Sequence, residues 1–132
     1  MNILITGVAG FIGFHCATEL IKLKKKYNVY GIDNLNDYYD VELKKDRLKL
    51  LQKNKNFNFY KLDITNKKKI EGVFKSKKIS VVLNLAASAG VRYSLENPST
   101  YLQNNINGFF NILELSTKYK INHLLFASSS SV

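Results

Sequence analysis

Short β-branched runs alternate with helix-patterned segments along this chain, and this alternation constrains the fold more than any other feature. The runs that we expect to form strands are Asn2–Thr6, Val29–Ile32, Phe57–Leu62, Ile79–Leu85 and His123–Phe126. Helical spacing of apolar residues predicts helices over Phe11–Lys25, Val41–Lys53, Asn66–Lys77 and Pro98–Tyr119. Successive strand–helix units with right-handed crossovers form a parallel sheet covered on both faces. The predicted fold class is therefore α/β, a doubly wound parallel sheet.

The composition bounds the size of the protein and its partners. A chain of 132 residues, 45% of them hydrophobic, is long enough for one domain with a real core. Lysine and arginine number 20 against 10 acidic residues, which gives a formal charge of +10. The lysines are scattered, with pairs or triplets at 24–26, 44–45, 67–69 and 77–78, and no nucleic-acid-binding motif accompanies them. We interpret them as solvated helix faces and expect no nucleic-acid partner.

Metal binding and membrane insertion find no support in the sequence. Cys16 is the only cysteine, and neither His15 nor His123 has a carboxylate at metal-ligand spacing, so we expect no metal site. No apolar stretch is long enough to span a membrane, and the N-terminus lacks the basic start of a secretion signal. A free thiol suits a reducing compartment. We therefore expect a cytoplasmic protein without a membrane partner.

A glycine-rich turn, TGVAGFIG, joins the first predicted strand to the first helix and places glycines at positions 7, 10 and 13. Glycines at such a turn let the backbone approach a pyrophosphate, whose charge the helix N-terminus stabilises. The spacing G-x-x-G-x-x-G is one residue longer between the first two glycines than the usual dinucleotide fingerprint. A turn required only for packing is the alternative interpretation.

Asp33 follows the second strand, 20 residues after Gly13. A carboxylate at this place accepts hydrogen bonds from ribose hydroxyls and repels a 2′-phosphate, and no arginine lies in the segment DNLND to offset that repulsion. The position therefore favours NAD over NADP as the cofactor. A cap of the turn that begins with Asp-Asn is the alternative role for this side chain.

Several longer motifs recur together: GIDNLNDYYD, LDIT, NLAASAGVRYSLENP, NNINGFFNIL and FASSSSV. With the glycine turn, this set resembles the NAD-dependent epimerase/dehydratase family, the extended short-chain dehydrogenase/reductases that act on nucleotide sugars. Within that family the chain is most similar to the UDP-glucuronate 4-epimerases, through DNLNDYYD and AGVRYSLENP. The resemblance covers essentially all 132 residues and implies an NAD-binding Rossmann fold, interrupted after its fifth strand.

The resemblance also implies roles for individual residues. The residues implied to bind the cofactor are Gly7, Gly10, Phe11, Ile12, Gly13, Asp33, Asn34, Asn36, Asp63, Ile64, Leu85, Ala86, Ala87 and Asn104. Ser129 matches the catalytic serine or threonine that hydrogen-bonds the sugar hydroxyl being oxidised. Substrate contacts are implied for Ser128 and Ser130 beside it, and for Arg92 and Ser94 in the loop that faces the sugar nucleotide. The alternative interpretation of Arg92 is an arginine that lies on the surface and has no role in binding.

The tyrosine and the lysine four residues later, on which the family's proton transfer depends, do not occur in this chain. None of the 8 tyrosines has a lysine four positions on. We therefore expect residues 1–132 to be an incomplete NAD-binding domain whose C-terminal substrate-binding part is absent, and the chain alone to be inactive. We also expect the fifth strand to form an unprotected edge, which lowers stability or promotes self-association.

The predicted function is thus the cofactor-binding part of a nucleotide-sugar epimerase that inverts C4 of a UDP-sugar through a 4-keto intermediate with NAD. UDP-glucuronate is the favoured substrate, and a homodimer the expected form of the complete protein. UDP-glucose 4-epimerase, nucleotide-sugar 4,6-dehydratase and uronate decarboxylase are alternatives within the family. A non-catalytic NAD-binding module is the alternative outside it.

Overall fold

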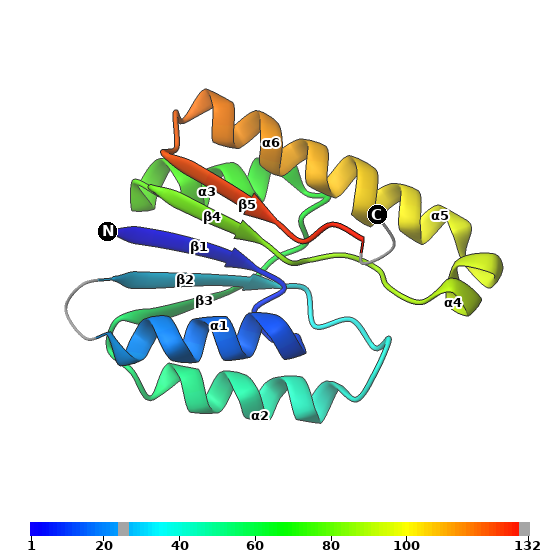
Figure 1. Ribbon diagram of the computed structural model, residues 1–132, viewed down its shortest axis with the longest axis horizontal. Coiled ribbons are helices and arrows are strands. Elements are labelled where there is room, and N and C mark those ends of the chain that lie inside the picture. The colour runs from blue at the N-terminus through cyan, green and yellow to red at the C-terminus, as the bar shows by residue number, and fades with distance from the viewer. Residues whose placement is uncertain (24–26, 130–132) are drawn as a thin grey trace.

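A computed structural model describes residues 1–23 and 27–129, which form one five-stranded parallel sheet (Figure 1). The strands are β1 (Asn2–Thr6), β2 (Asn28–Asp33), β3 (Phe57–Lys61), β4 (Val81–Asn84) and β5 (His123–Phe126). Their order in the sheet is β3-β2-β1-β4-β5, and each neighbouring pair is parallel. This is the order of a Rossmann-type sheet whose direction of winding reverses next to β1. The predicted fold class is confirmed.

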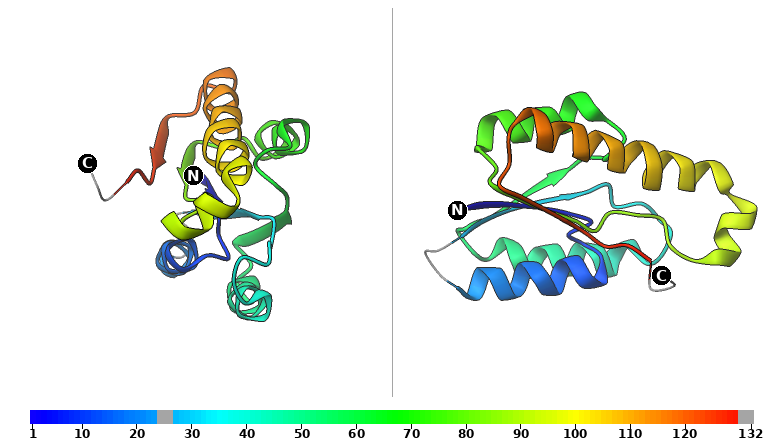
Figure 2. Two further views of the ribbon diagram at one scale, coloured as in Figure 1. Left: turned by 90° about the vertical axis from the view of Figure 1, so that its right-hand side faces the viewer. Right: turned by 45° about the horizontal axis from the view of Figure 1, so that its top comes forward.

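The helices lie on both faces of the sheet, as the two additional views in Figure 2 also show. One face carries α1 (Phe11–Lys22) and α2 (Val41–Gln52), and the other carries α3 (Lys67–Lys77) and α6 (Phe109–Lys118). Two short helices, α4 (Val91–Glu96) and α5 (Pro98–Tyr101), and a π-helical segment, η1 (Leu102–Gly108), lead into α6. In the described part of the chain, no helix is long and apolar enough to cross a membrane.

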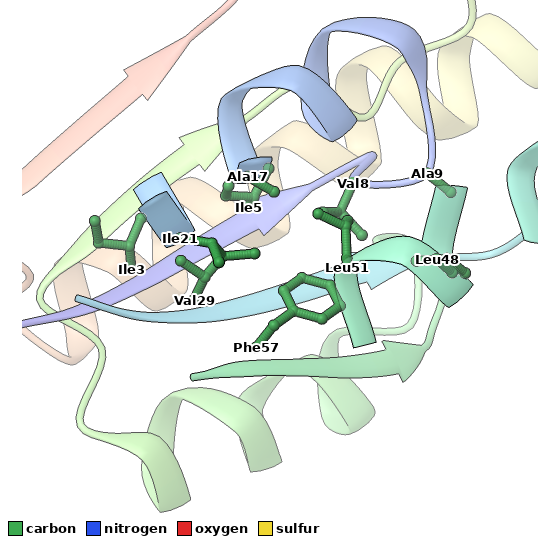
Figure 3. Packing of buried hydrophobic residues seen from close by; sticks show 10 residues of the cluster. All are labelled: Ile3, Ile5, Val8, Ala9, Ala17, Ile21, Val29, Leu48, Leu51 and Phe57. Atoms are coloured by element: carbon green, nitrogen blue, oxygen red, sulfur yellow. The ribbon is translucent and has the colours of Figure 1, made fainter. Parts of the chain in front are cut away.

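Period-two alternation along β1 divides the core into two layers. Ile3 and Ile5 point to the face of α1 and α2, where they pack with Val29 and Leu48 (Figure 3). Leu4, between them, joins the second cluster on the opposite face, which includes apolar residues of α3 and α6. Because successive side chains of a strand point to opposite faces, one apolar run supplies both layers. The continuous run NILIT is therefore the sequence of a strand buried on both sides.

The two helices after β2 and β3 begin at side-chain caps. Asp40 accepts hydrogen bonds from the backbone N–H groups of Glu42 and Leu43, and Asn66 accepts one from that of Lys69. Such caps satisfy N–H groups that have no partner within the helix. They fix where each βα loop ends, and thereby hold the loops that leave the carboxyl ends of the strands.

Several predicted boundaries require correction. The first helix ends at Lys22 rather than Lys25, and residues 24–26 lie outside the described part of the chain. The fourth strand is limited to the four residues that pair with Ile3–Thr6 of β1. The helix predicted over Pro98–Tyr119 is divided by the π-helical segment, and it ends at Lys118.

The segment that carries Arg92 and Ser94 is also not the predicted loop, because it folds into the short helix α4. Ser94 donates its backbone N–H to the carbonyl of Gly90 and its hydroxyl to that of Val91. These local bonds close a helical turn directly after Gly90, whose φ of +93° lies in the region that favours glycine. A six-residue helix with no buried residue leaves no apolar period by which it could be recognised in the sequence.

Candidate functional site

A cleft of about 320 Å³ opens beyond the carboxyl ends of β1, β2 and β4. Open α/β sheets bind ligands at this edge, where the direction of winding reverses. Most of the predicted cofactor-binding residues line the cleft, namely Gly7, Gly10, Asp33, Asn34, Asn36, Asp63, Ile64, Leu85, Ala86, Ala87 and Asn104. Phe11, Ile12 and Gly13 belong to the same turn but do not line the cleft.

The glycine turn is packed so closely that two of its three glycines admit no side chain. Gly7 has a φ of +68°, and a Cβ on it would lie 2.9 Å from the backbone nitrogen of Ala86. A Cβ on Gly13 would lie 2.2 Å from the carbonyl oxygen of Gly7. Gly10 caps α1 without a side chain, and no acidic residue lies in the first helical turn. Gly10, the cap of this helix, lines the cleft, and no side chain neutralises the helix N-terminus beside it, which suits a phosphate.

Asp33 binds the glycine turn to the end of β2. Its carboxylate is buried, one oxygen accepting from the backbone N–H of Ala9 at 3.0 Å and the other from that of Leu35 at 2.9 Å. The bond to Leu35 is the turn cap that the sequence left open as an alternative. Each carboxylate oxygen has a second lone pair, so capping does not exclude a bond to a ribose hydroxyl.

Asn34 and Asp63 connect the loops after β2 and β3. The amide of Asn34 donates to Asp63 at 2.8 Å, and Thr65 donates both its hydroxyl and its backbone N–H to the same carboxylate. Burial by itself raises the pKa of Asp63, but the hydrogen bonds from Thr65 and Asn34 outweigh it and hold that pKa below its usual value. The carboxylate is thus ionised and fixed at the wall of the cleft.

Lys44 is a cleft residue that sequence reasoning assigned to a solvated helix face, and this interpretation is wrong. The residue is only 4% exposed, and its ammonium group donates to both the carbonyl and the amide oxygen of Asn36, each at 2.7 Å. Desolvation lowers its pKa, and neighbouring Asp33 partly opposes that effect. The buried residues of α2 are spaced as Lys44, Leu48 and Leu51, so the helical period contained the signal.

The β4–α4 loop is held to its neighbours by a hydroxyl and by two amides. Thr6 accepts from the backbone N–H groups of Leu85 and Ala86, each at 3.1 Å. Asn104 donates to the Ser88 hydroxyl at 2.8 Å, whereas Asn105 binds both the backbone N–H and the carbonyl of Ser88. Asn105 therefore holds this loop to the segment η1.

The predicted catalytic and substrate residues that the structure describes do not line the cleft. Ser128 and Ser129 are exposed and follow β5, and Ala127 just before them donates to the carbonyl of Asn84 at the end of β4. Arg92 and Ser94 lie on α4, where Tyr93 between them lines the cleft. Ser130 lies outside the described residues. The described residues 1–23 and 27–129 contain no group of three potential metal ligands.

The strand order, the glycine turn and the cleft define a Rossmann-type α/β protein. A family model described as GDP-mannose 4,6 dehydratase matches residues 4–132. The chain belongs to this family of NAD-dependent epimerases and dehydratases. The resemblance predicted from its motifs is thereby confirmed.

Individual relatives agree with this assignment. The chain is 54% identical to Protein CapI of Staphylococcus aureus over 132 residues, and 50% identical to UDP-glucuronate 4-epimerase of Thermodesulfobacterium geofontis over 129 residues. These alignments cover 100% and 98% of the chain but 39% of each relative. The crystal structure of a Bacillus cereus UDP-glucuronic acid 4-epimerase, in complex with UDP-glucuronic acid and NAD, matches with a TM-score of 0.91 at 36% identity. That match covers 100% of this chain and 41% of the other.

Proposed function

We propose that this chain binds NAD and forms the cofactor-binding part of a nucleotide-sugar 4-epimerase. The observation that carries the proposal is the bond between the Asp33 carboxylate and the Ala9 N–H, because it holds a ribose-binding type of acceptor against the glycine turn. The glycines at positions 7 and 10 line the cleft and support the same ligand, since a pyrophosphate needs close backbone approach.

In this proposal each wall of the cleft holds one part of the dinucleotide. The glycine turn and the N-terminus of α1 bind the pyrophosphate, and Asp33 accepts from the adenosine ribose. Asn34, Asn36, Asp63 and Ile64 surround the adenine. The nicotinamide ribose lies along Leu85, Ala86, Ala87 and Asn104. Bound NAD supplies the oxidation and reduction at the sugar carbon, while the protein orients the sugar and manages its proton.

Ser129 is the proposed catalytic residue of this chain, as a hydrogen-bonding partner of the sugar hydroxyl that is oxidised. The proposed substrate contacts are Ser128, Ser130, Arg92 and Ser94. The guanidinium group of Arg92 suits a carboxylate or a phosphate. The sequence lacks a tyrosine followed four residues later by a lysine. We therefore propose that residues 1–132 bind NAD but turn over no UDP-sugar by themselves.

For a complete protein built on these residues, we propose C4 inversion of a UDP-sugar through a 4-keto intermediate, with UDP-glucuronate as the favoured substrate. Half-exposed apolar side chains along η1 and α6, such as Ile106 and Phe110, support contact with further protein, consistent with a homodimer. The single free thiol, Cys16, supports a cytoplasmic location.

The binding proposal is tested by titrating the 132-residue chain with NADH and with NADPH, followed by nicotinamide fluorescence. We expect saturable NADH binding, weaker binding of NADPH, and no turnover of UDP-glucuronate or UDP-glucose. An Asp46→Asn variant, changed on the exposed face of α2, is the matched control for cleft substitutions. Tighter NADPH binding, or none of either nucleotide, contradicts the proposal.

The substrate proposal is tested with a chimera, in which these 132 residues replace the matching part of the Bacillus cereus epimerase. Interconversion at C4 is then measured with UDP-glucuronate and with UDP-glucose. We expect the chimera to act on UDP-glucuronate and to lose this activity with Ser129→Ala. A preference for UDP-glucose would move the assignment to another substrate of the same family.

A further inference from the structure

A hydrogen bond joins the two loops that enclose the candidate cleft. Tyr38 lies in the β2–α2 loop, and its hydroxyl donates to the carbonyl of Ala89 in the β4–α4 loop at 2.9 Å. The two residues are 51 positions apart, and both loops leave the carboxyl side of the sheet (Figure 1). The link therefore bridges the two walls between which a ligand of the cleft would lie.

The Ala89 end of this bridge is fixed by other bonds. Tyr101 of α5 donates its hydroxyl to the carbonyls of Ala89 and Gly90, at 2.7 and 2.6 Å. Asn105 binds the backbone of Ser88 on both sides. Burial, with the nearby rings of Tyr38 and Tyr93, raises the pKa of Tyr101, so this phenol stays a donor. The β4–α4 loop is thus an anchored acceptor, and Tyr38 reaches it from the opposite side.

Aromatic packing holds the Tyr38 ring in place for this bond. The Tyr93 ring meets it edge-on with centroids 4.9 Å apart, and both residues line the cleft. Gly90 leaves room for the hydroxyl, because a Cβ there would lie 2.7 Å from the Tyr38 oxygen. Tyr38 is nevertheless 48% exposed, so no surrounding core would keep its ring from swinging away once the bond is broken.

We propose that Tyr38 is a strap that closes the cleft and controls the rate at which the dinucleotide enters and leaves. The inference rests on the proposed function, because it takes the ligand of the cleft to be NAD. Asn36 and Asp37 line the cleft from one loop, and Leu85 to Ser88 from the other. A ligand between them passes only when the loops separate, and separation breaks the bond between Tyr38 and Ala89.

This role predicts a kinetic signature that direct ligand contact does not produce. The strap is a bond within the protein, so its removal lowers the barrier to entry and to exit alike. In Tyr38→Phe we expect the association and dissociation rate constants of NADH each to rise about two- to tenfold, the range for one net hydrogen bond. The dissociation constant should change by less than the individual rates.

The experiment is stopped-flow fluorescence of the 132-residue chain, mixed with NADH for association and chased with excess NAD for dissociation. Gly90→Ala disturbs the same bond from the other loop and should accelerate both rates. If both substitutions act on one bond, the double variant should be no faster than the faster single variant. Tyr30→Phe, in β2 and outside the cleft, is the matched control and should leave both rates unchanged.

The outcomes separate the strap from the function on which it rests. Faster association and dissociation in Tyr38→Phe, with Tyr30→Phe unchanged, supports the strap. Faster dissociation with unchanged association means that Tyr38 touches the ligand directly, and it overturns the strap alone, as do unchanged rates. A wild-type chain that binds no NADH overturns the proposed function, and the strap with it.

Discussion

β1 and β5 are parallel strands of one sheet, but their surroundings differ completely. β1 pairs with β2 on one side and β4 on the other, and its Leu4 and Ile5 are fully buried. Among the described residues β5 pairs only with β4, and its Leu125 and Phe126 are 43% and 55% exposed. The glycine turn therefore extends from the most firmly held strand, whereas Ser128 and Ser129 extend from an edge. The difference indicates that the core sets the geometry of the proposed pyrophosphate site. The position of the serines depends instead on the pairing of β5 with β4.

Truncating a side chain in each strand gives the largest contrast. Ile5→Ala should lower the free energy of unfolding by about 2–5 kcal/mol, because it leaves a cavity between fixed neighbours. Leu125→Ala should cost about 1 kcal/mol or less, because its side chain is already half in water. Urea unfolding of both variants measures the two values. Equal losses would show that β5 is held as firmly as β1, and would remove the contrast.

The next largest effect concerns the turn that follows β1. Gly13→Ala should cost about 1–3 kcal/mol and abolish NADH binding, because the new Cβ would displace the Gly7 carbonyl. Gly72→Ala in α3 is the control, since a Cβ there meets nothing within 4 Å. That variant should gain about 0.5–1 kcal/mol from helix propensity. NADH binding by Gly13→Ala at wild-type affinity would refute the close-packed turn.

A change of charge at the end of β2 should have a smaller effect. Asp33→Asn removes the charge and replaces one of the two acceptor oxygens by an NH₂ group that cannot accept from Ala9 or Leu35, so we expect NADH affinity to fall by about tenfold or more. NADPH affinity should fall less, because the repulsion of a 2′-phosphate is removed at the same time. Parallel titrations of both nucleotides measure this ratio. If the ratio of the two affinities does not change, capping the turn would be the only role of Asp33.

The smallest effect concerns Asp63, which follows β3 at the other edge of the sheet. Its carboxylate accepts a hydrogen bond from Asn34, which follows β2. Hydrogen bonds hold the pKa of Asp63 below its usual 3.8, so its ionised form stabilises the folded chain above that pH. This contribution, less than about 1 kcal/mol at so partly exposed a site, is lost as the pH falls through the folded pKa. Wild type should therefore exceed Asp63→Asn in stability above about pH 5 by a constant amount and lose this advantage below about pH 4. A stability difference that does not vary with pH would contradict the role of the ionised carboxylate.

Most of the fold was predictable because each strand is a short apolar run bounded by turn residues. The predicted bounds of β5, His123–Phe126, agree with the structure at both ends. Asn122 precedes this run, and Ala127 and the serines follow it, so the sequence marks both boundaries. The cleft was predictable for a similar reason, because Gly7, Asp33 and Leu85 each directly follow or end a strand. Parallel strands bring their carboxyl ends together, so position along the chain determines position in the site.

What could not be predicted depends on contacts between distant segments. The burial of Lys44 depends on the carbonyl of Asn36, which offers an oxygen to the ammonium group only after the loop has folded. The hydroxyl of Tyr38 reaches the carbonyl of Ala89, 51 positions away, and no local pattern indicates such a partner. The helix over Val91–Glu96 buries no side chain, so hydrophobic periodicity carries no sign of it. The helical period of α2 marks Lys44 as buried, but no period in a sequence indicates the hydrogen-bond partners of Lys44 and Tyr38.

The π-helical segment Leu102–Gly108 restricts how the length of this protein can change. An α-helix turns by about 100° per residue, and a π-helical turn accommodates one residue more than an α-helical one. Deleting one residue would let the segment relax into an ordinary α-helix with the following helix still facing the sheet, whereas inserting one more residue would rotate everything after it by about that angle relative to Asn104 and Asn105. After such an insertion Ile112 and Leu115, both fully buried, would turn away from the sheet. This segment should therefore accept the loss of one residue more readily than the gain of one.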